Sequence, residues 1–253
     1  MPSSFNKCII IILFIFKLIL GQKNKRKIKA AIFDLDGTLL DSQKLYDEVN
    51  QIIINKYGNG KLYDIDSKMV NHGAPPLIGN KYLIETFQIN LTIEEIIKKK
   101  DEFFKDNIKL CLPMEGAKEI THILKHEYGF KMGLATSSVK TSVDIKLNNL
   151  KEWFNSDFDV IVTGDDKRIF KGKPNPDIFL LTAKELGVDI EECIIFEDAV
   201  KGIQAGLNSG APIVVGMPEN FFKAKVEELP YNKEKTKLIL LESLKDFDYS
   251  LIK

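Results

Sequence analysis

The sequence has few cysteines, histidines and arginines, and its charges of opposite sign cancel. Among its 253 residues there are three cysteines and three histidines, and 36 basic residues balance 36 acidic ones. The cysteines are too few and too scattered for a disulfide scaffold, and no CxxC pair indicates a zinc site. A net charge of zero gives no reason to expect a nucleic acid partner, because nucleic-acid-binding domains usually carry a basic excess.

The remaining composition is that of an ordinary globular protein. Hydrophobic residues make up 44% of the chain and charged residues 28%. These fractions exclude a disordered chain, a collagen and a low-complexity repeat. The length fits one large domain or two modest ones.

One hydrophobic run is present, and it lies at the N-terminus. Cys8–Leu20 is almost entirely apolar, follows Lys7 and is interrupted by Lys17. The run is short of the roughly 20 residues that span a bilayer, and it resembles the apolar region of a signal peptide. The basic residues that follow it argue against clean translocation. We treat residues 1–27 as a hydrophobic leader and basic linker, which leaves three possibilities: a secretory signal, a membrane tether, or an extension that the mature protein lacks. Without such a function the protein is expected in the cytoplasm, with no integral membrane domain.

After the leader, short apolar runs alternate with helical patterns. The predicted strands are Lys29–Asp34, Lys131–Ala135, Val160–Val162, Cys193–Phe196, Pro212–Val215 and Leu238–Leu241. Predicted helices include Gly116–His126, a helix capped by Asn175 with Pro176 in its first position and ending at Gly187, and Val200–Asn208, ending at Gly210. This alternation predicts an α/β fold, a Rossmann-like parallel sheet covered by helices on both faces.

One long stretch breaks the alternation. Between about Ser42 and Leu110 the pattern is helical throughout, with turns near Gly58–Gly60 and His72–Gly79. We therefore predict a helical cap at residues 46–110, inserted into a core formed by residues 28–45 and 111–253. The Gly/Pro-rich turn at His72–Pro76 is a candidate for reaching the substrate.

The strongest chemical signal is Asp34-Leu35-Asp36-Gly37-Thr38, at the end of the first strand. On a continuing strand, Asp34 and Asp36 would point the same way, toward the end of the sheet where ligands bind. The two carboxylates would repel each other unless a cation lay between them. Mg²⁺ prefers oxygen ligands, so the sequence predicts a magnesium site here.

Further polar groups follow the later strands. Thr136 and Ser137 offer hydroxyl and backbone N–H groups for an anion, and Lys173 offers a positive charge for phosphate oxygens. Glu197 and Asp198 follow another buried strand and can hold a metal. Carboxylates for a cation together with donors for an anion are the groups that phosphoryl transfer requires.

In this order, the motifs resemble the haloacid dehalogenase-like hydrolase superfamily, from about Ile28 to Leu241. The segments LATSS, GKPNPDIFL and IIFEDAVKGIQA are similar to the branch that holds pseudouridine-5′-phosphatase, plant glycerol-3-phosphate phosphatase and β-phosphoglucomutase. The resemblance implies roles for these residues: Asp34 as nucleophile and Asp36 as acid–base, both also metal ligands (Asp36 through its backbone carbonyl), Thr136, Ser137 and Lys173 as phosphate ligands, and Glu197 and Asp198 as metal ligands.

The resemblance implies a monomeric Mg²⁺-dependent phosphatase that acts on a small phosphorylated metabolite through an aspartyl phosphate. A mutase is the alternative, but Tyr46 stands where β-phosphoglucomutases have a histidine, and the cap contains no arginine to hold a second phosphate. Lys61, Lys68 or Lys81 could replace that arginine. A module that only accepts a phosphoryl group or binds a ligand is the non-enzymatic alternative.

Other residues have simpler interpretations. His122 and His126 have the i, i+4 spacing of a metal site on a helix, but the sequence shows no third ligand, and we expect them to be surface residues. Trp153 and Phe154 are expected to pack in the core.

Overall fold

The computed structural model describes residues 27–253. The predicted leader and linker, residues 1–27, lie outside these residues except for Lys27. Within the described part, no helix is both long and apolar enough to cross a membrane.

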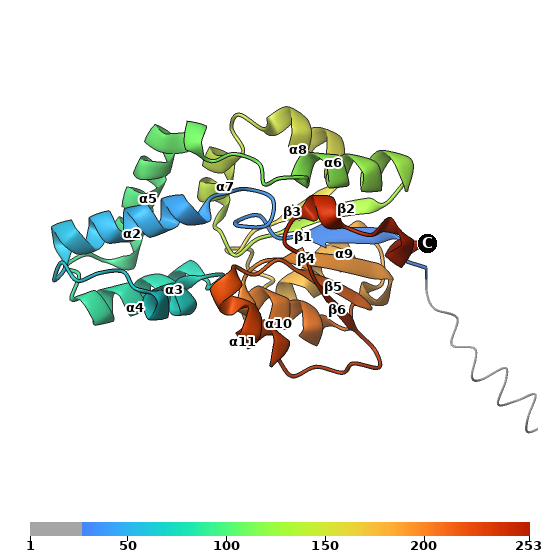
Figure 1. Cartoon of the computed structure of the whole chain (residues 1–253). Helices are drawn as coiled ribbons and strands as arrows, with labels where there is room; N and C mark the ends of the chain where they lie inside the picture. The colour runs from blue at the N-terminus through green and yellow to red at the C-terminus, as the bar shows by residue number, and fades with distance from the viewer. Residues whose placement is uncertain (1–26) are drawn as a thin grey trace, which may run out of the picture.

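Within residues 27–253 a single six-stranded sheet forms the centre of the molecule (Figure 1). All of its pairings are parallel, in the order β3-β2-β1-β4-β5-β6. The strands are β1 (Ala30–Phe33), β2 (Lys131–Ala135), β3 (Val160–Val162), β4 (Cys193–Glu197), β5 (Ile213–Gly216) and β6 (Lys237–Leu240). The predicted α/β fold with a parallel sheet is therefore confirmed. The direction of winding reverses between β1 and β4, which is where ligands bind in sheets of this kind.

Helices cover both faces of the sheet, as its alternating buried residues require. Ala31 and Phe33 of β1 pack into one apolar layer, and Ala30 and Ile32 pack into the other. The first layer includes α6 (Ala117–His122), its π-helical continuation η2 (Ile123–Glu127), α7 (Lys140–Lys146), α8 (Lys151–Asp157) and the C-terminal turns η5 (Leu244–Asp246) and η6 (Tyr249–Ile252). The second includes α9 (Asp177–Leu186), α10 (Val200–Ser209) and α11 (Lys223–Glu227). The remaining short turns are η1 (Ile108–Leu110), η3 (Ile190–Glu192) and η4 (Asn220–Phe222).

The predicted helix ends are mostly correct. Gly187 ends α9 and Gly210 ends α10, each in the left-handed conformation that glycine adopts without strain. The start of α9 was predicted one residue too early. Pro176 occupies the cap position instead of the first turn, and the Asn175 side chain donates to the Gly172 carbonyl oxygen (3.2 Å) instead of capping the helix.

Residues 43–107 form four helices inserted between β1 and β2. They are α2 (Gln43–Tyr57), α3 (Ile65–Asn71), α4 (Pro76–Phe87) and α5 (Ile93–Asn107). They enclose an apolar cluster of their own, which includes Ile53, Leu83 and Ile96. The sequence prediction missed α3, a helix of seven residues that buries only Ser67 and keeps Ile65, Met69 and Val70 at least partly exposed. The predicted boundary at residue 46 falls inside α2.

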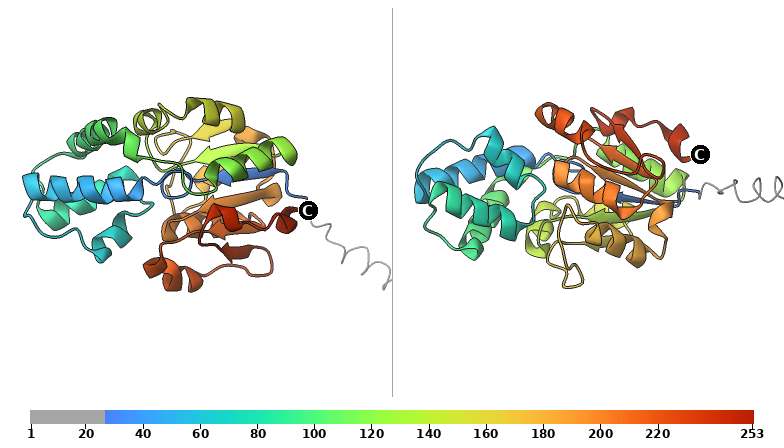
Figure 2. Two further views of the ribbon diagram at one scale, coloured as in Figure 1. Left: turned by 45° about the horizontal axis from the view of Figure 1, so that its top comes forward. Right: turned by 90° about the horizontal axis from the view of Figure 1, so that it is seen from below.

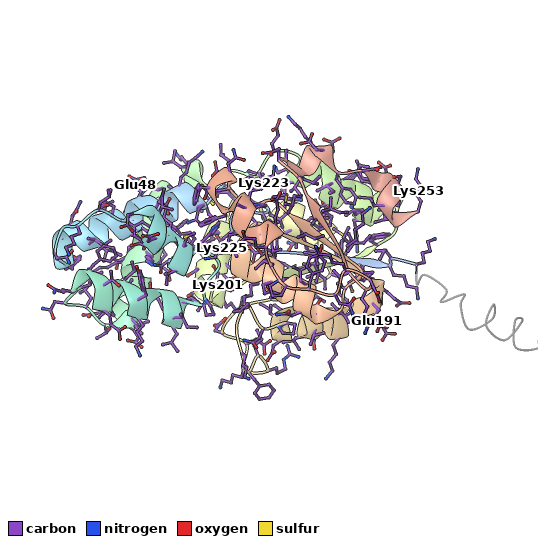
Figure 3. All side chains as sticks on the ribbon, turned by 60° about the horizontal axis from the view of Figure 1, so that its bottom comes forward. Glu48, Glu191, Lys201, Lys223, Lys225 and Lys253 are labelled. Atoms are coloured by element: carbon purple, nitrogen blue, oxygen red, sulfur yellow. The ribbon has the colours of Figure 1, made fainter. Side chains whose placement is uncertain are left out.

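The four inserted helices, here called the cap, lie beyond the carboxyl ends of the strands, and the C-terminus lies at the opposite end (Figures 1 and 2). Two contacts between the core and the cap use main-chain carbonyl groups of the cap. Lys201 of α10 donates to the carbonyl oxygen of Val70 in α3 (2.5 Å), and Figure 3 shows Lys201 where the core meets the cap. The Ser137 hydroxyl donates to the Gly73 carbonyl oxygen (3.4 Å). The turn after α3 is thus held against the ends of the strands.

Candidate active site

The register of the sheet brings Asp34 and Glu197 together. Phe33 of β1 pairs with Phe196 of β4, and the Asp34 amide donates to the Phe196 carbonyl oxygen (3.0 Å). Asp34 therefore follows β1 beside the last residue of β4, at the point where the direction of winding reverses. Asp198 is the next residue after β4.

Asp34, Glu197 and Asp198, here called the acidic cluster, are all buried. One carboxylate oxygen from each lies within 4.8 Å of the others. Lys173 lies against two of these residues, with its Nζ 2.6 Å from Asp34 Oδ1 and 2.6 Å from Glu197 Oε1. The Lys173 side chain is only 1% exposed, so its ion pairs are shielded from water.

Burial controls the ionisation of the acidic cluster. Desolvation raises the pKa of Asp34 well above its usual value, Lys173 lowers it in part, and the neighbouring carboxylates raise it again. Desolvation likewise raises the pKa of Glu197. Burial alone would lower the pKa of Lys173, but Asp34 and Glu197 raise it above its ordinary value, so this lysine stays charged. The cluster carries more negative charge than one lysine can balance.

Asp198 accepts hydrogen bonds from both the core and the cap. Thr38 Oγ1 donates to Asp198 Oδ1 (2.9 Å), and His72 Nε2 lies 2.9 Å from Asp198 Oδ2. Burial lowers the pKa of His72, but its hydrogen bond to Asp198 and the charge of that carboxylate raise it to about 9. Gly37 makes the close approach of this carboxylate possible, since a Cβ at that position would lie 2.0 Å from Asp198 Oδ2.

Asp36 lies in a different charge environment from Asp34, although both line the same cavity. Its two oxygens accept from Lys146 Nζ at 2.6 and 2.7 Å, and they also accept from Ser42 (2.6 Å) and Ser138 (2.7 Å). Burial raises the pKa of Asp36, but the charge and hydrogen bonds of Lys146 outweigh it and leave the pKa below its usual value. Strand β1 ends at Phe33, so Asp34 and Asp36 do not lie on a continuing strand as predicted. Asp34 pairs with Lys173 and Asp36 pairs with Lys146, and the Asp36 side chain is not part of the acidic cluster.

Two of the three predicted phosphate ligands line the same cavity. Thr136 and Ser137 follow β2 and border it. The Thr136 hydroxyl oxygen accepts from the Ser138 amide (3.1 Å), which fixes its position. Lys173, the third predicted ligand, contacts Asp34, which itself lines the cavity. The structure thus brings together Asp34, Asp36, Thr136, Ser137, Lys173, Glu197 and Asp198, and the roles assigned to them stay predictions.

The cap supplies the other wall of the cavity. His72, Gly73, Ala74 and Pro76 line it, in agreement with the prediction that this turn reaches the site. The three lysines named as replacements for a cap arginine do not line the cavity. Lys68 pairs with Asp47 (2.5 Å), Lys81 pairs with Glu85, and Lys61 is exposed. Lys100 lines it instead and donates to Asn80 Oδ1 (2.7 Å). Burial lowers the pKa of Lys100 to about 7.

Sequence reasoning missed both Lys100 and Lys146. Lys146 follows Val143 by three residues and precedes Leu147, so it lies on the buried face of α7 where an apolar residue is the rule. A lysine on the apolar face of a helix was the only indication in the sequence that Lys146 has a buried partner. Lys100 lies within EEIIKKKDEFFK, where a run of charges predicts a solvated helix face.

The acidic cluster fits a divalent cation. Its ligand atoms are all carboxylate oxygens, which hard ions prefer. Lys173 and a protonated His72 lie against the three carboxylates, so the ionised cluster keeps an excess negative charge that a divalent ion would offset. Asp34, Glu197 and Asp198 would hold the ion. When bound, it would offset negative charge on a phosphate ester.

Comparisons with known proteins agree with this geometry. A family model described as haloacid dehalogenase-like hydrolase matches residues 28–210. A Saccharomyces cerevisiae protein described as a probable pseudouridine-5′-phosphatase is 35% identical over 196 residues, covering 74% of this chain and 81% of the yeast protein. A Drosophila melanogaster protein of the same description is 30% identical over 203 residues, covering 78% and 84%.

The fold is also found among solved structures. The crystal structure of CbbY from Rhodobacter sphaeroides in complex with phosphate has a TM-score of 0.71 and 22% identity, covering 87% of this chain and 96% of that one. The matched region contains every predicted site residue, from Asp34 to Asp198. The chain belongs to the haloacid dehalogenase-like hydrolase family.

Proposed function

We propose that this protein is a Mg²⁺-dependent phosphatase that hydrolyses a small phosphomonoester through an aspartyl phosphate on Asp34. One observation carries the proposal: Asp34 lies at the cavity with Lys173 at 2.6 Å and two further carboxylates within 4.8 Å. A carboxylate is a weak nucleophile toward an anionic ester, so positive charge beside it is essential. The family membership and the names of the relatives support the same reaction.

The reaction has two displacements. In the first, an Asp34 oxygen forms a bond to phosphorus, the bond to the leaving oxygen breaks, and Asp36 gives that oxygen a proton. In the second, water attacks the phosphorus, Asp36 takes the proton from the water, and the bond to Asp34 breaks. Phosphate leaves, and both carboxylates return to their first state. Thr136 and Ser137 would hold the other phosphate oxygens.

The hydrogen bonds of Asp36 suit the second displacement. Lys146 contacts both of its oxygens and keeps the carboxylate ionised, as a base requires. The first displacement needs a protonated Asp36, so Lys146 must release at least one oxygen. Lys146 also donates to the Tyr46 hydroxyl of cap helix α2 (2.6 Å). We propose that movement of the cap moves Lys146 and thereby switches Asp36 between its two roles.

The cap wall favours a leaving group with hydrogen-bond donors. Asn50 Oδ1 is buried and has no donor among the described residues. An unsatisfied buried acceptor costs about 1–3 kcal/mol, which a ligand donor would recover. Asn71 and Asn80 add amide groups to the same wall. The N–H groups of a uracil-like base or the hydroxyls of a sugar or glycerol could serve, and the relatives' names favour pseudouridine 5′-phosphate.

The test is phosphate release by the purified full chain from pseudouridine 5′-phosphate, glycerol 3-phosphate and β-glucose 1-phosphate. We expect release with Mg²⁺, none with EDTA, and the highest kcat/KM for pseudouridine 5′-phosphate. Conversion of β-glucose 1-phosphate to glucose 6-phosphate without phosphate release would instead identify a mutase. A long-lived acylphosphate with no turnover on any substrate would identify a phosphoryl acceptor.

The Asp36→Asn variant tests the acid–base role. Asparagine cannot transfer the proton, so turnover should fall about 10²–10⁴-fold while substrate binding is kept. Substrate affinity, measured by calorimetry, separates this loss from a damaged site. Normal turnover by Asp36→Asn would refute the role.

A further inference from the structure

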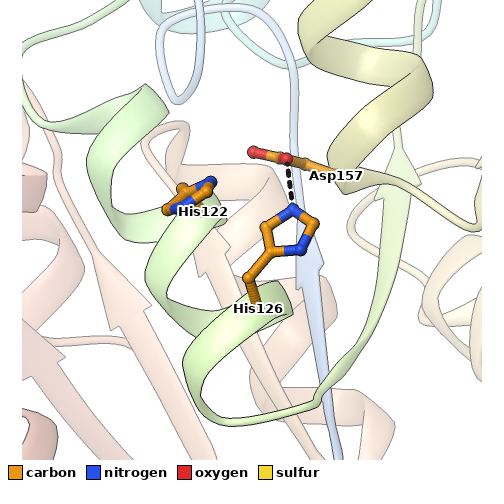
Figure 4. A group of neighbouring side chains, drawn as sticks. All are labelled: His122, His126 and Asp157. Carbon is orange, nitrogen blue, oxygen red and sulfur yellow. Dashed lines mark hydrogen bonds and ion pairs between the residues drawn. The ribbon is translucent and has the colours of Figure 1, made fainter.

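His122, His126 and Asp157, here called the histidine cluster, lie together on the surface of the core. The two histidines come from α6 and η2, and Asp157 is the last residue of α8 (Figure 4). One potential ligand atom from each lies within 4.8 Å of the others. His126 Nε2 is 3.1 Å from Asp157 Oδ1, a carboxylate 31 residues further along the chain. The fold thus supplies the third ligand that the sequence did not show.

The cluster is remote from the proposed active site. His126 precedes β2 by five residues and Asp157 precedes β3 by three, so the cluster lies near the amino ends of these strands. The acidic cluster lies at the carboxyl ends. The proposed phosphatase reaction uses none of the three residues.

We propose that the histidine cluster binds a transition-metal ion of the Zn²⁺ type and thereby joins α6–η2 to α8. Imidazole nitrogens favour Zn²⁺ over Mg²⁺, and two histidines with one carboxylate are an established ligand set for it. Ligand atoms around a tetrahedral zinc are about 3.3 Å apart, for bonds of about 2.0–2.1 Å. The His126–Asp157 separation already fits, and the exposed His122 has a ring nitrogen within 4.8 Å of the other two ligand atoms.

The surroundings of Asp157 prepare it as a ligand. Its side chain is 4% exposed, and Thr121 Oγ1 donates to its Oδ2 (2.8 Å), which leaves Oδ1 facing the histidines. Trp153 Nε1 donates in turn to Thr121 Oγ1 (2.8 Å). Such outer hydrogen bonds orient metal ligands. His126 lies within a π-helical turn and His122 directly precedes it, and turns of this kind are frequent at functional sites.

The test is zinc binding by the purified full chain in excess Mg²⁺, followed by calorimetry and by NMR of the histidine side chains. We expect one equivalent of Zn²⁺ that shifts the imidazole signals of His122 and His126 and raises the Tm. The His122→Ala and His126→Gln variants should neither bind this Zn²⁺ ion nor show the increase in Tm. Thr121→Val should weaken it about 10–100-fold.

Matched variants identify the ligands. Glu119→Gln and Glu127→Gln remove neighbouring carboxylates and should leave zinc binding unchanged, and Asp198→Asn removes a member of the acidic cluster and should also keep this equivalent. The proposal is overturned if Zn²⁺ leaves both imidazole signals unmoved, or if it binds His122→Ala as tightly as the original chain. Loss of the equivalent in Glu119→Gln or Asp198→Asn, but not in the histidine variants, would also overturn it.

Discussion

The acidic cluster and the histidine cluster both gather three possible metal ligands from separate elements, yet they differ in nearly every physical respect. The acidic cluster is buried, consists of carboxylates and contacts Lys173. The histidine cluster keeps both imidazoles exposed and has one buried carboxylate. Burial removes the water that would otherwise screen like charges, so the carboxylates of the acidic cluster repel one another and a cation would reduce that repulsion. The histidine cluster has little such repulsion, because water solvates its imidazoles.

The two clusters therefore suit different cations, and their loss should have different consequences. Oxygen ligands with an excess negative charge favour a hard divalent ion, and imidazoles favour a softer one. Substitutions in the buried cluster should therefore abolish function, and substitutions in the exposed cluster should change metal binding with little other effect.

The Asp34→Asn variant should give the largest loss. Without a carboxylate the phosphoryl acceptor is missing, and turnover should fall by about 10³-fold or more. Phosphate release under saturating Mg²⁺ measures the loss. Asp144→Asn removes an aspartate that is 63% exposed and should keep full activity. Comparable turnover in Asp34→Asn and Asp144→Asn would remove the basis of the comparison.

The Lys146→Met variant should lose stability at neutral pH. The pKa of Asp36 is lowered in the folded protein, so the Asp36–Lys146 pair stabilises the fold above the unfolded pKa of about 3.9. This stabilisation is lost as the pH falls through the folded pKa. Leaving a buried charge unpaired costs about 3–5 kcal/mol.

Urea unfolding of Lys146→Met at several pH values measures this cost. The deficit in the free energy of unfolding should be largest near neutrality and shrink in acid. Lys140→Met, at an exposed position of the same helix, serves as the control. A deficit that stayed constant with pH would show that lost packing, and not the ion pair, is the cause.

Lys100 should make substrate binding depend on pH near neutrality. Burial lowers its pKa to about 7, so over the pH unit above this value its charged fraction falls about fivefold. If the charged lysine contacts the substrate, KM should rise by the same factor. Lys100→Met should have a raised KM that is flat across this window, and exposed Lys98→Met should behave as the original chain does. An unchanged KM in Lys100→Met would place Lys100 outside the substrate contacts.

The His122→Ala variant should have the smallest effect. In metal-free protein an exposed side chain contributes little, so the free energy of unfolding should change by no more than about 0.5 kcal/mol. Phosphate release should stay at the level of the original chain. Thermal unfolding with and without EDTA measures the change in stability. A large loss of metal-free stability or of turnover would mean that the two clusters are coupled.

Much of the fold could be predicted because the signals are local. Short apolar runs mark the strands, with ends correct to within about a residue, since a strand buried on both faces needs apolar residues throughout. Gly187 and Gly210 mark helix ends because they adopt the left-handed conformation. The helix α3 was not predicted, since it has only seven residues and no buried apolar side chain.

The polar groups that follow the strands could be read from the local sequence. Asp34, Thr136, Glu197 and Asp198 come directly after apolar runs, and parallel strands must bring such residues to one edge. Three further features depend on packing: Asp36 pairs with Lys146, Lys100 lines the cavity, and Asp157 lies beside two histidines. A lysine or aspartate within an amphipathic helix has the same local pattern whether it meets water or a buried partner. The partner comes from a distant part of the chain, and packing alone selects it.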